Sequence, residues 1–106
     1  MEIQRNDFKD LAEALRLFAQ RRDWEKFHTP KNLAMAVAGE AGELAAEFQW
    51  LTPTDSERSA LSPEKLDAVA MEIADVQIYL LRLADVLGID IPDVVRRKIA
   101  VNESRF

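Results

Sequence analysis

Apolar side chains recur every three or four residues along most of the chain, and this spacing predicts amphipathic helices. In the first segment the recurring residues are Phe8, Leu11, Leu15 and Phe18, with polar residues between them. We expect four helices, at about 6–24, 30–51 and 63–87 and from about 91 onward. No alternating pattern competes with these segments, so the predicted fold is all-α and resembles a four-helix bundle.

Capping residues mark the expected helix ends. Thr29 and Ser62 each precede a proline, which is tolerated at the first position of a helix. Asn6 or Asp7 suits the start of the first helix and Asp90 the start of the last, and Gly88 suits the end of the third. The polar stretch 52–61 between the second and third helices is expected to be a loop.

The acids of the second and third helices lie where apolar residues are expected. Glu40, Glu43 and Glu47 are the only charged residues between Lys31 and Leu51, and they share a helical stripe with leucines. The opposite side of that helix consists of small residues and Met35, which permit close approach of another helix. The pattern therefore predicts a helix buried on most sides, with one wall facing a polar cavity.

The third helix repeats this arrangement. Glu72 and Asp75 are the only charges between Asp67 and Arg82. Each pair, Glu40 with Glu43 and Glu72 with Asp75, has the spacing that places both carboxylates on one side of a helix. If the two helices are antiparallel, four carboxylates converge, and hard divalent cations such as Mg²⁺ would relieve their repulsion.

A magnesium site has two competing interpretations. Glutamates on helices are usually solvated or paired with lysine and arginine, and Glu47 is left open between an ion pair and a role in orienting a metal ligand. A di-iron bundle also uses inward carboxylates, but it needs Glu-x-x-His motifs. The one histidine, His28, lies outside both acidic helices, which disfavours iron.

Length and composition add the broader limits. With 106 residues we expect one domain, 1–106, and a chain this short that is 48% hydrophobic points to an oligomer. There is no cysteine, so a disulfide or thiolate metal site is excluded. The net charge of −5 without a basic tract disfavours binding to a nucleic acid polymer. The charged N-terminus and the lack of a long apolar run predict a cytoplasmic protein that does not associate with membranes.

The motifs GEAGELAAEFQW and EIADVQIYL together resemble the MazG-type all-α nucleoside triphosphate pyrophosphohydrolases, whose signature is ExxE followed by ExxD. The stretches RRDWEKFHTPKNL and KIAVNESRF are similar to the dCTP pyrophosphatase branch of that family. This resemblance implies hydrolysis of a nucleoside triphosphate, such as dCTP or a related or modified deoxynucleotide, to the monophosphate and pyrophosphate. It also implies homodimers or dimers of dimers, with sites near subunit interfaces.

The resemblance assigns roles position by position. Glu40, Glu43, Glu72 and Asp75 match the magnesium ligands, and Glu43 or Glu72 is the candidate base that orients or deprotonates the attacking water. The positions that match or suit substrate contacts are Trp24, His28, Trp50, Tyr79, Lys98 and Asn102. Leu15 stands where dCTP-specific relatives can have histidine, so the preferred base and sugar stay open.

Each candidate substrate residue also has an ordinary structural interpretation. Trp24, Phe27 and Trp50 flank the second helix and could stack on a base or simply pack in the core, and Tyr79 could also just pack. His28 could be a loop residue that forms hydrogen bonds. Lys98 alone would be an unremarkable surface lysine. The corresponding alternative for the whole chain is a non-catalytic helical module that binds nucleotides or mediates oligomerisation.

Overall fold

The computed structural model describes residues 7–106, and all regular structure within this range is helical. The α-helices are α1 (Asp7–Arg21), α2 (Pro30–Ala46), α3 (Pro63–Leu87) and α4 (Ile91–Arg105), and short 3₁₀ helices lie at Glu25–Phe27 and Arg58–Ala60. The predicted all-α fold is confirmed. Among the described helices, none combines the length and the apolar content needed to cross a membrane.

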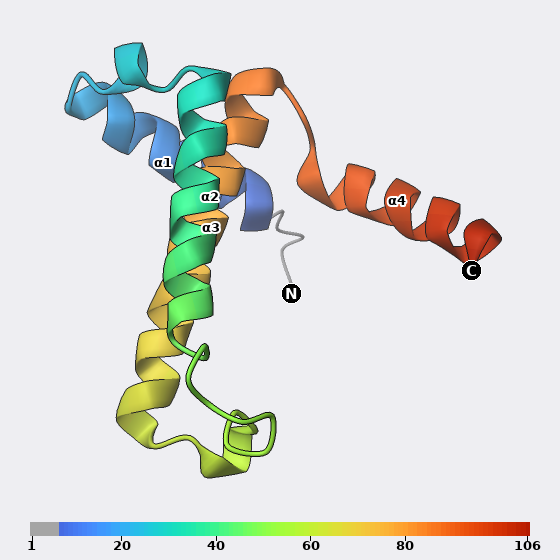
Figure 1. Ribbon diagram of the computed structural model, residues 1–106. Coiled ribbons are helices and arrows are strands. Elements are labelled where there is room, and N and C mark those ends of the chain that lie inside the picture. Colours follow the sequence, from blue (N-terminus) through green and yellow to red (C-terminus); the bar gives the residue numbers. More distant parts are fainter. Residues whose placement is uncertain (1–6) are drawn as a thin grey trace, which may run out of the picture.

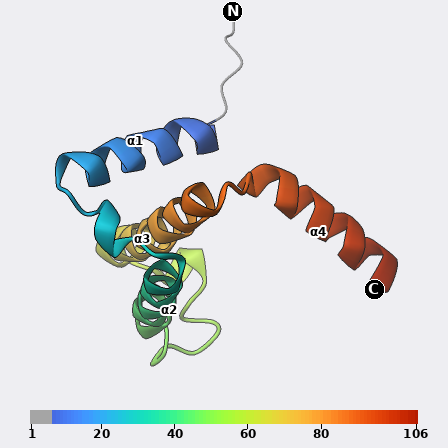
Figure 2. The same cartoon turned by 90° about the horizontal axis from the view of Figure 1, so that it is seen from above.

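Helices α2 and α3 form an antiparallel pair, and α1 lies across the C-terminal half of α3 (Figure 1, Figure 2). The fully buried Leu33 of α2 and the buried Val69, Leu81 and Ala84 of α3 belong to the core. Ala19 of α1 is buried as well. Helix α3 therefore contacts both other packed helices and is the central element of the fold.

The predicted caps are confirmed at three helix starts. The side chains of Thr29, Ser62 and Asp90 accept hydrogen bonds from the backbone N–H three residues later, at 3.2, 3.1 and 3.2 Å. Gly88 ends α3 in the left-handed conformation, with φ of 69°. Asn6, expected as a cap of α1, lies outside the described residues, and Asp7 is already the first helical residue.

The second helix is shorter than predicted. It ends at Ala46 rather than near Leu51, and residues 47–50 form turns. The reason is a change of hydrogen bonding: the N–H groups of Glu47 and Phe48 donate to carbonyls three residues back. Such bonds tighten the last turn and end the regular α-helix.

Helix α4 extends away from the other three helices (Figure 1, Figure 2). None of its residues is buried, and its apolar side chains Val95, Ile99 and Val101 are about half exposed, at 48%, 54% and 47%. Residues 7–106 therefore form four α-helices, as predicted, but among them only α1, α2 and α3 pack together.

Candidate functional site

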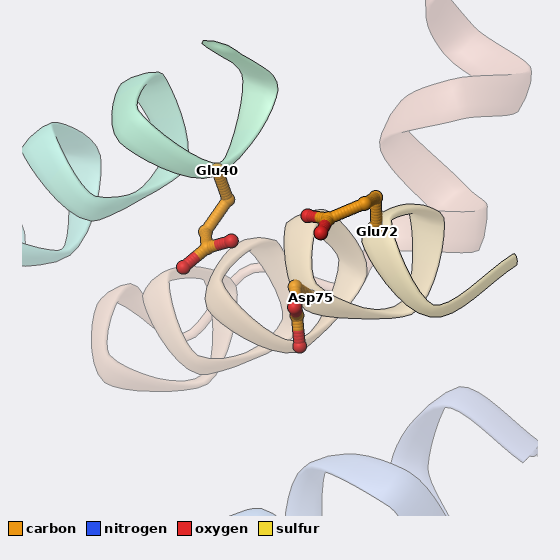
Figure 3. Close-up of side chains that lie close together, drawn as sticks. All are labelled: Glu40, Glu72 and Asp75. Carbon is orange, nitrogen blue, oxygen red and sulfur yellow. The ribbon is translucent and has the colours of Figure 1, made fainter. Parts of the chain in front are cut away.

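Three acidic side chains meet between α2 and α3. Glu40 comes from α2, and Glu72 and Asp75 come from neighbouring turns of α3 (Figure 3). One carboxylate oxygen from each lies within 4.8 Å of the others, and all three residues are half-buried. The antiparallel packing predicted from the two acid motifs thus brings acids from both helices to one place.

Glu72 is the residue whose environment is least suited to a free carboxylate. Its Oε2 is buried and has no hydrogen-bond partner among the described residues. Burial raises the pKa of Glu72, and the negative charges of Asp75, Glu43, Glu40 and Glu47 raise it further. A buried oxygen without a donor, surrounded by other carboxylates, is the arrangement that a hard divalent cation satisfies.

Glu43 and Glu47 lie near this cluster but outside the group of three. Glu43 is exposed, and its charge contributes to the raised pKa of Glu72. Glu47 accepts a hydrogen bond from Lys65 Nζ at 2.8 Å, in an ion pair between the end of α2 and the start of α3. Of the two roles left open for Glu47, the structure contains the ion pair.

A separate cavity of about 240 Å³ lies between α1, the segment that connects α1 to α2, and α3. Three of the residues predicted to contact substrate, Trp24, His28 and Tyr79, line it. The other lining residues are Leu15, Phe18, Ala19, Ile78 and Arg82. This volume is below the 300–1,000 Å³ typical of sites for drug-sized ligands, so the cavity has room for a small group, such as a single ring system.

Trp24 is held at the cavity by the way α1 ends. Asp23 adopts the left-handed conformation with φ of 56°, the Asp23 N–H donates to the Gln20 carbonyl at 3.1 Å, and the Trp24 N–H donates to the Ala19 carbonyl at 2.9 Å. These are the two bonds of a Schellman motif. The Trp24 ring then packs edge-on against Phe18, with 5.6 Å between centroids.

Arg82 lines the same cavity and was not predicted from the sequence. It is 5% exposed, and its Nε donates to His28 Nδ1 at 3.0 Å while a terminal nitrogen donates to Asp85 at 3.0 Å. Asp85 also accepts two hydrogen bonds of 3.0 Å from Arg16 of α1. The signal that could have found Arg82 is that it is the one cation in the apolar run 68–84.

One face of α3 connects the acid cluster to the cavity. Glu72, Asp75, Tyr79 and Arg82 follow at helical spacings of three and four residues, so they lie in a row along the helix. The first two belong to the acid cluster and the last two line the cavity. A ligand whose anionic end is bridged to the acids by a cation, and whose other end is a ring, could therefore contact both along this face.

The remaining predicted residues lie elsewhere in this chain. Trp50 is 88% exposed in the turn after α2 and does not line the cavity. Lys98 and Asn102 are exposed on α4, which points away from the acid cluster (Figure 1). Within one chain the structure does not bring these three residues to the acids or to the cavity.

Comparison with known proteins identifies a family and several similar proteins. The model of the MazG-like family matches residues 36–106. The mouse protein dCTP pyrophosphatase 1 is 44% identical over 89 residues, and the match covers 84% of this chain and 52% of that protein. The chain thus spans about half the length of the mammalian relatives it matches.

For two further relatives, the match covers a larger share of the relative's own length. A dATP/dGTP diphosphohydrolase from cyanophage S-2L is 46% identical, with 59% of this chain and 73% of that protein covered. A pyrophosphatase from Archaeoglobus fulgidus, known from its crystal structure, has a TM-score of 0.88 and 40% identity. That match covers 100% of this chain and 97% of the other.

Proposed function

This chain belongs to the MazG-like family, and we propose that it hydrolyses nucleoside triphosphates to the nucleoside monophosphate and pyrophosphate. The substrate class is dCTP or a related deoxynucleotide, including modified ones. The relatives named for dCTP pyrophosphatase and for dATP/dGTP diphosphohydrolase support this class of reaction and leave the base open.

The observation that carries the proposal is the row of residues on α3. Acids at Glu72 and Asp75 are followed on the same face by Tyr79 and Arg82 at the cavity. A nucleoside triphosphate has the matching form, with a polyphosphate at one end and a flat base at the other. The base would occupy the cavity, and the phosphates would lie at the acids.

The polyphosphate is negative, so it needs a cation to approach the acid cluster. In this proposal Glu40, Glu72 and Asp75 would hold Mg²⁺, since each offers one carboxylate oxygen to the same place. The buried, unpartnered Oε2 of Glu72 supports this fit. Magnesium bound there supplies Lewis-acid chemistry and neutralises phosphate charge.

The chain's own side chains supply orientation and proton transfer. Trp24 offers a ring for stacking against the base, while Leu15 and Phe18 form apolar walls that exclude water. Glu43 is the candidate base for the attacking water, because it is exposed and adjacent to the cluster without belonging to the group of three. Its carboxylate is therefore free to accept a proton while the other acids hold the cation.

The site is completed by a second copy of the chain in this proposal. Lys98 and Asn102 lie on α4, and this helix extends away from α2 and α3, which carry the acids (Figure 2). The half-exposed apolar side chains of α4 suit packing against another protomer. In a homodimer or a dimer of dimers, Lys98 would reach a phosphate and Asn102 the sugar or base of a neighbouring site.

The test is a substrate panel of nucleoside triphosphates, with modified cytosines included, incubated with Mg²⁺. We expect release of pyrophosphate, detected as orthophosphate only after an inorganic pyrophosphatase is added. Glu40→Gln and Glu72→Gln should each lower turnover about 100-fold or more, since even indirect partners of metal ligands contribute 10- to 100-fold. Glu64→Gln, an exposed acid in the first turn of α3, is the charge-matched control.

The proposal is wrong if no nucleotide in the panel yields pyrophosphate, or if the acid variants turn over like the control. Binding of an uncleavable dCTP analogue without turnover of dCTP would instead identify a non-catalytic nucleotide-binding module.

A further inference from the structure

The hydrogen bond between Arg82 and His28 has a chemical consequence for the imidazole. The Nε of arginine carries a proton and has no lone pair to offer, and the guanidinium stays charged at all ordinary pH values. His28 Nδ1, 3.0 Å from Arg82 Nε, is therefore the acceptor. An imidazolium or an Nδ1–H tautomer would place two donors against each other.

We propose that Arg82 is a positioning residue that holds His28 as a neutral imidazole with its proton on Nε2. His28 then presents one N–H donor at the wall of the cavity that Leu15, Trp24 and Tyr79 also line. The group it recognises is a hydrogen-bond acceptor, a carbonyl oxygen or a ring nitrogen, on the edge of a flat heterocycle.

Arg82 is fixed by its own partners, which makes it suitable for this role. Its side chain is 6% exposed and donates to Asp85 Oδ2 at 3.0 Å. That carboxylate is held in turn by two hydrogen bonds from Arg16 on α1. The chain of contacts from Arg16 to His28 thus joins α1, α3 and the segment that precedes α2, so the imidazole orientation is set by three parts of the chain.

The charges around His28 favour the same protonation state. Burial lowers the pKa of His28, and the positive charge of Arg82 lowers it further, while Glu25 acts in the opposite direction. Tyr79, on the facing side of α3, is the other titratable group that lines the cavity. The neutral imidazole required by the hydrogen-bond geometry is thus also favoured electrostatically.

The tautomer of His28 is a property of the protein without substrate. That the Nε2–H of His28 recognises a base rests on the proposed function. A base that offers an acceptor to Nε2–H would be retained in the cavity. An analogue with a C–H at that position would leave the donor unpaired, which disfavours binding. Leu15 and Phe18, also at the cavity, add only apolar surface, so His28 contributes directional selectivity.

The direct experiment measures the tautomer, and the chain is well suited to it because it contains one histidine. A long-range ¹H–¹⁵N spectrum of the metal-free protein reports the protonation of each imidazole nitrogen. We expect an unprotonated Nδ1 and a protonated Nε2 at neutral pH. A protonated Nδ1, or averaged signals from both tautomers, would overturn the inference.

Variants test whether Arg82 causes this state. Arg82→Met should give averaged tautomers and a higher pKa of His28, because both the donor and the positive charge are removed. Arg97→Met, on the exposed face of α4, is the matched control and should leave the spectrum unchanged. An Arg82→Met spectrum identical to that of the native protein would also overturn the inference, and the native spectrum remains decisive if this variant does not fold.

Substrate kinetics distinguish a role of Arg82 in positioning His28 from a general role of Arg82 in stabilising the fold. The side-chain amide of His28→Gln can place an N–H close to where Nε2 lies, and it does so without help from Arg82. We expect Arg82→Met to raise KM for dCTP about tenfold in the native background, consistent with loss of one oriented hydrogen bond. The same change should have a smaller effect in the His28→Gln background, and equal effects in both would contradict the positioning role.

Failure of this inference is distinguishable from failure of the proposed function. Turnover of dCTP with a protonated Nδ1 would overturn the role of Arg82 and leave the activity intact. The predicted tautomer without turnover of any nucleotide would support the role of Arg82 and overturn the activity.

Discussion

Lys65 Nζ lies 2.8 Å from Glu47 Oε1 and joins the end of α2 to the start of α3 across the connecting loop. Both side chains are partly shielded, with 33% and 24% of their surfaces exposed. Glu47 follows Glu40 and Glu43 at spacings of three and four residues, and it lies just past the end of α2. Its carboxylate is therefore engaged in closing the helix pair and not in the acid cluster.

Removing this pair should weaken the fold without removing the cation site. We expect Glu47→Gln and Lys65→Met each to lower the free energy of unfolding by about 0.5–1 kcal/mol, as for partly exposed ion pairs. That corresponds to a fall in melting temperature of roughly 2–8 °C for a domain of this size. Calorimetry with and without Mg²⁺ measures both effects, and the stabilisation by Mg²⁺ should persist.

Lys31→Met provides the control for this prediction. Lys31 is exposed in the first turn of α2, where the helix dipole disfavours a positive charge, so its removal should not destabilise the fold. If Glu47→Gln abolishes the response to Mg²⁺ as Glu40→Gln is expected to, then Glu47 belongs to the metal site.

The raised pKa of Glu72 predicts an unusual dependence of stability on pH in the absence of metal. Its ordinary value is 4.5, and burial followed by the charges of neighbouring acids raises it in the folded state. The folded protein therefore binds this proton more tightly than the unfolded chain does. This contribution to stability is complete below the ordinary pKa and is lost as pH rises through the raised pKa.

Glu72→Gln isolates this contribution because Gln cannot titrate. In EDTA, the melting temperature of the native protein relative to Glu72→Gln should fall as pH rises through that window. With Mg²⁺ present the trend should reverse for the native protein, because the cation binds the deprotonated acids of the folded state. Glu64→Gln should track the native protein in both conditions, and parallel curves for native and Glu72→Gln in EDTA would exclude the raised pKa.

The fold was predictable where local chemistry decides it. Thr29, Ser62 and Asp90 mark helix starts because their side chains satisfy backbone N–H groups nearby in sequence. The end of α2 at Ala46 was missed because the apolar pattern continues through Phe48 and Leu51 while the hydrogen bonding changes. The spacing of apolar residues in the sequence does not reveal that change in backbone hydrogen bonding.

The candidate site was predictable where it lies on two neighbouring helices. The convergence of Glu40 with Glu72 and Asp75 follows from helical spacing and an antiparallel pair. The hydrogen bond between Arg82 and His28 could not be predicted in the same way, because His28 lies 54 positions away in the sequence. Such contacts depend on how α1 crosses α3, which the amphipathic pattern leaves undetermined.

Trp24 should report nucleotide binding directly. The chain has two tryptophans, so Trp50→Phe leaves Trp24 as the only one. We expect dCMP to quench its fluorescence through stacking in the cavity, and Trp24→Leu to raise KM for dCTP roughly ten- to hundredfold, as for aromatic residues that stack on bases.

Phe27→Leu is the matched aromatic control for Trp24→Leu. Phe27 is 59% exposed and does not line the cavity, so its loss should leave KM for dCTP within about twofold, as expected for a surface change away from the site. Equal KM values for native protein and Trp24→Leu would remove the cavity from the proposed substrate site.

The distance between α4 and the acid cluster predicts that each site needs two copies of the chain. Lys98→Met should lower kcat/KM about ten- to hundredfold, the effect of losing a hydrogen bond to a charged group. Glu72→Gln should be inactive for a different reason, because it alters the acid cluster of its own chain. The two variants therefore carry defects in different parts of a shared site.

Mixing the Lys98→Met and Glu72→Gln variants tests whether each site is built from two copies of the chain. After subunit exchange, some sites combine the intact acids of a Lys98→Met chain with the intact α4 of a Glu72→Gln chain, so part of the activity should return. A mixture of Glu72→Gln with Glu40→Gln is the control, because both defects lie in the same acid cluster and no combination of chains restores it. If activity does not return in the first mixture and light scattering shows a monomer at micromolar concentration, then α4 does not act on a neighbouring site. The role of Lys98 in catalysis would then have to be abandoned, since α4 extends away from α2 and α3, the helices that carry the acids (Figure 1).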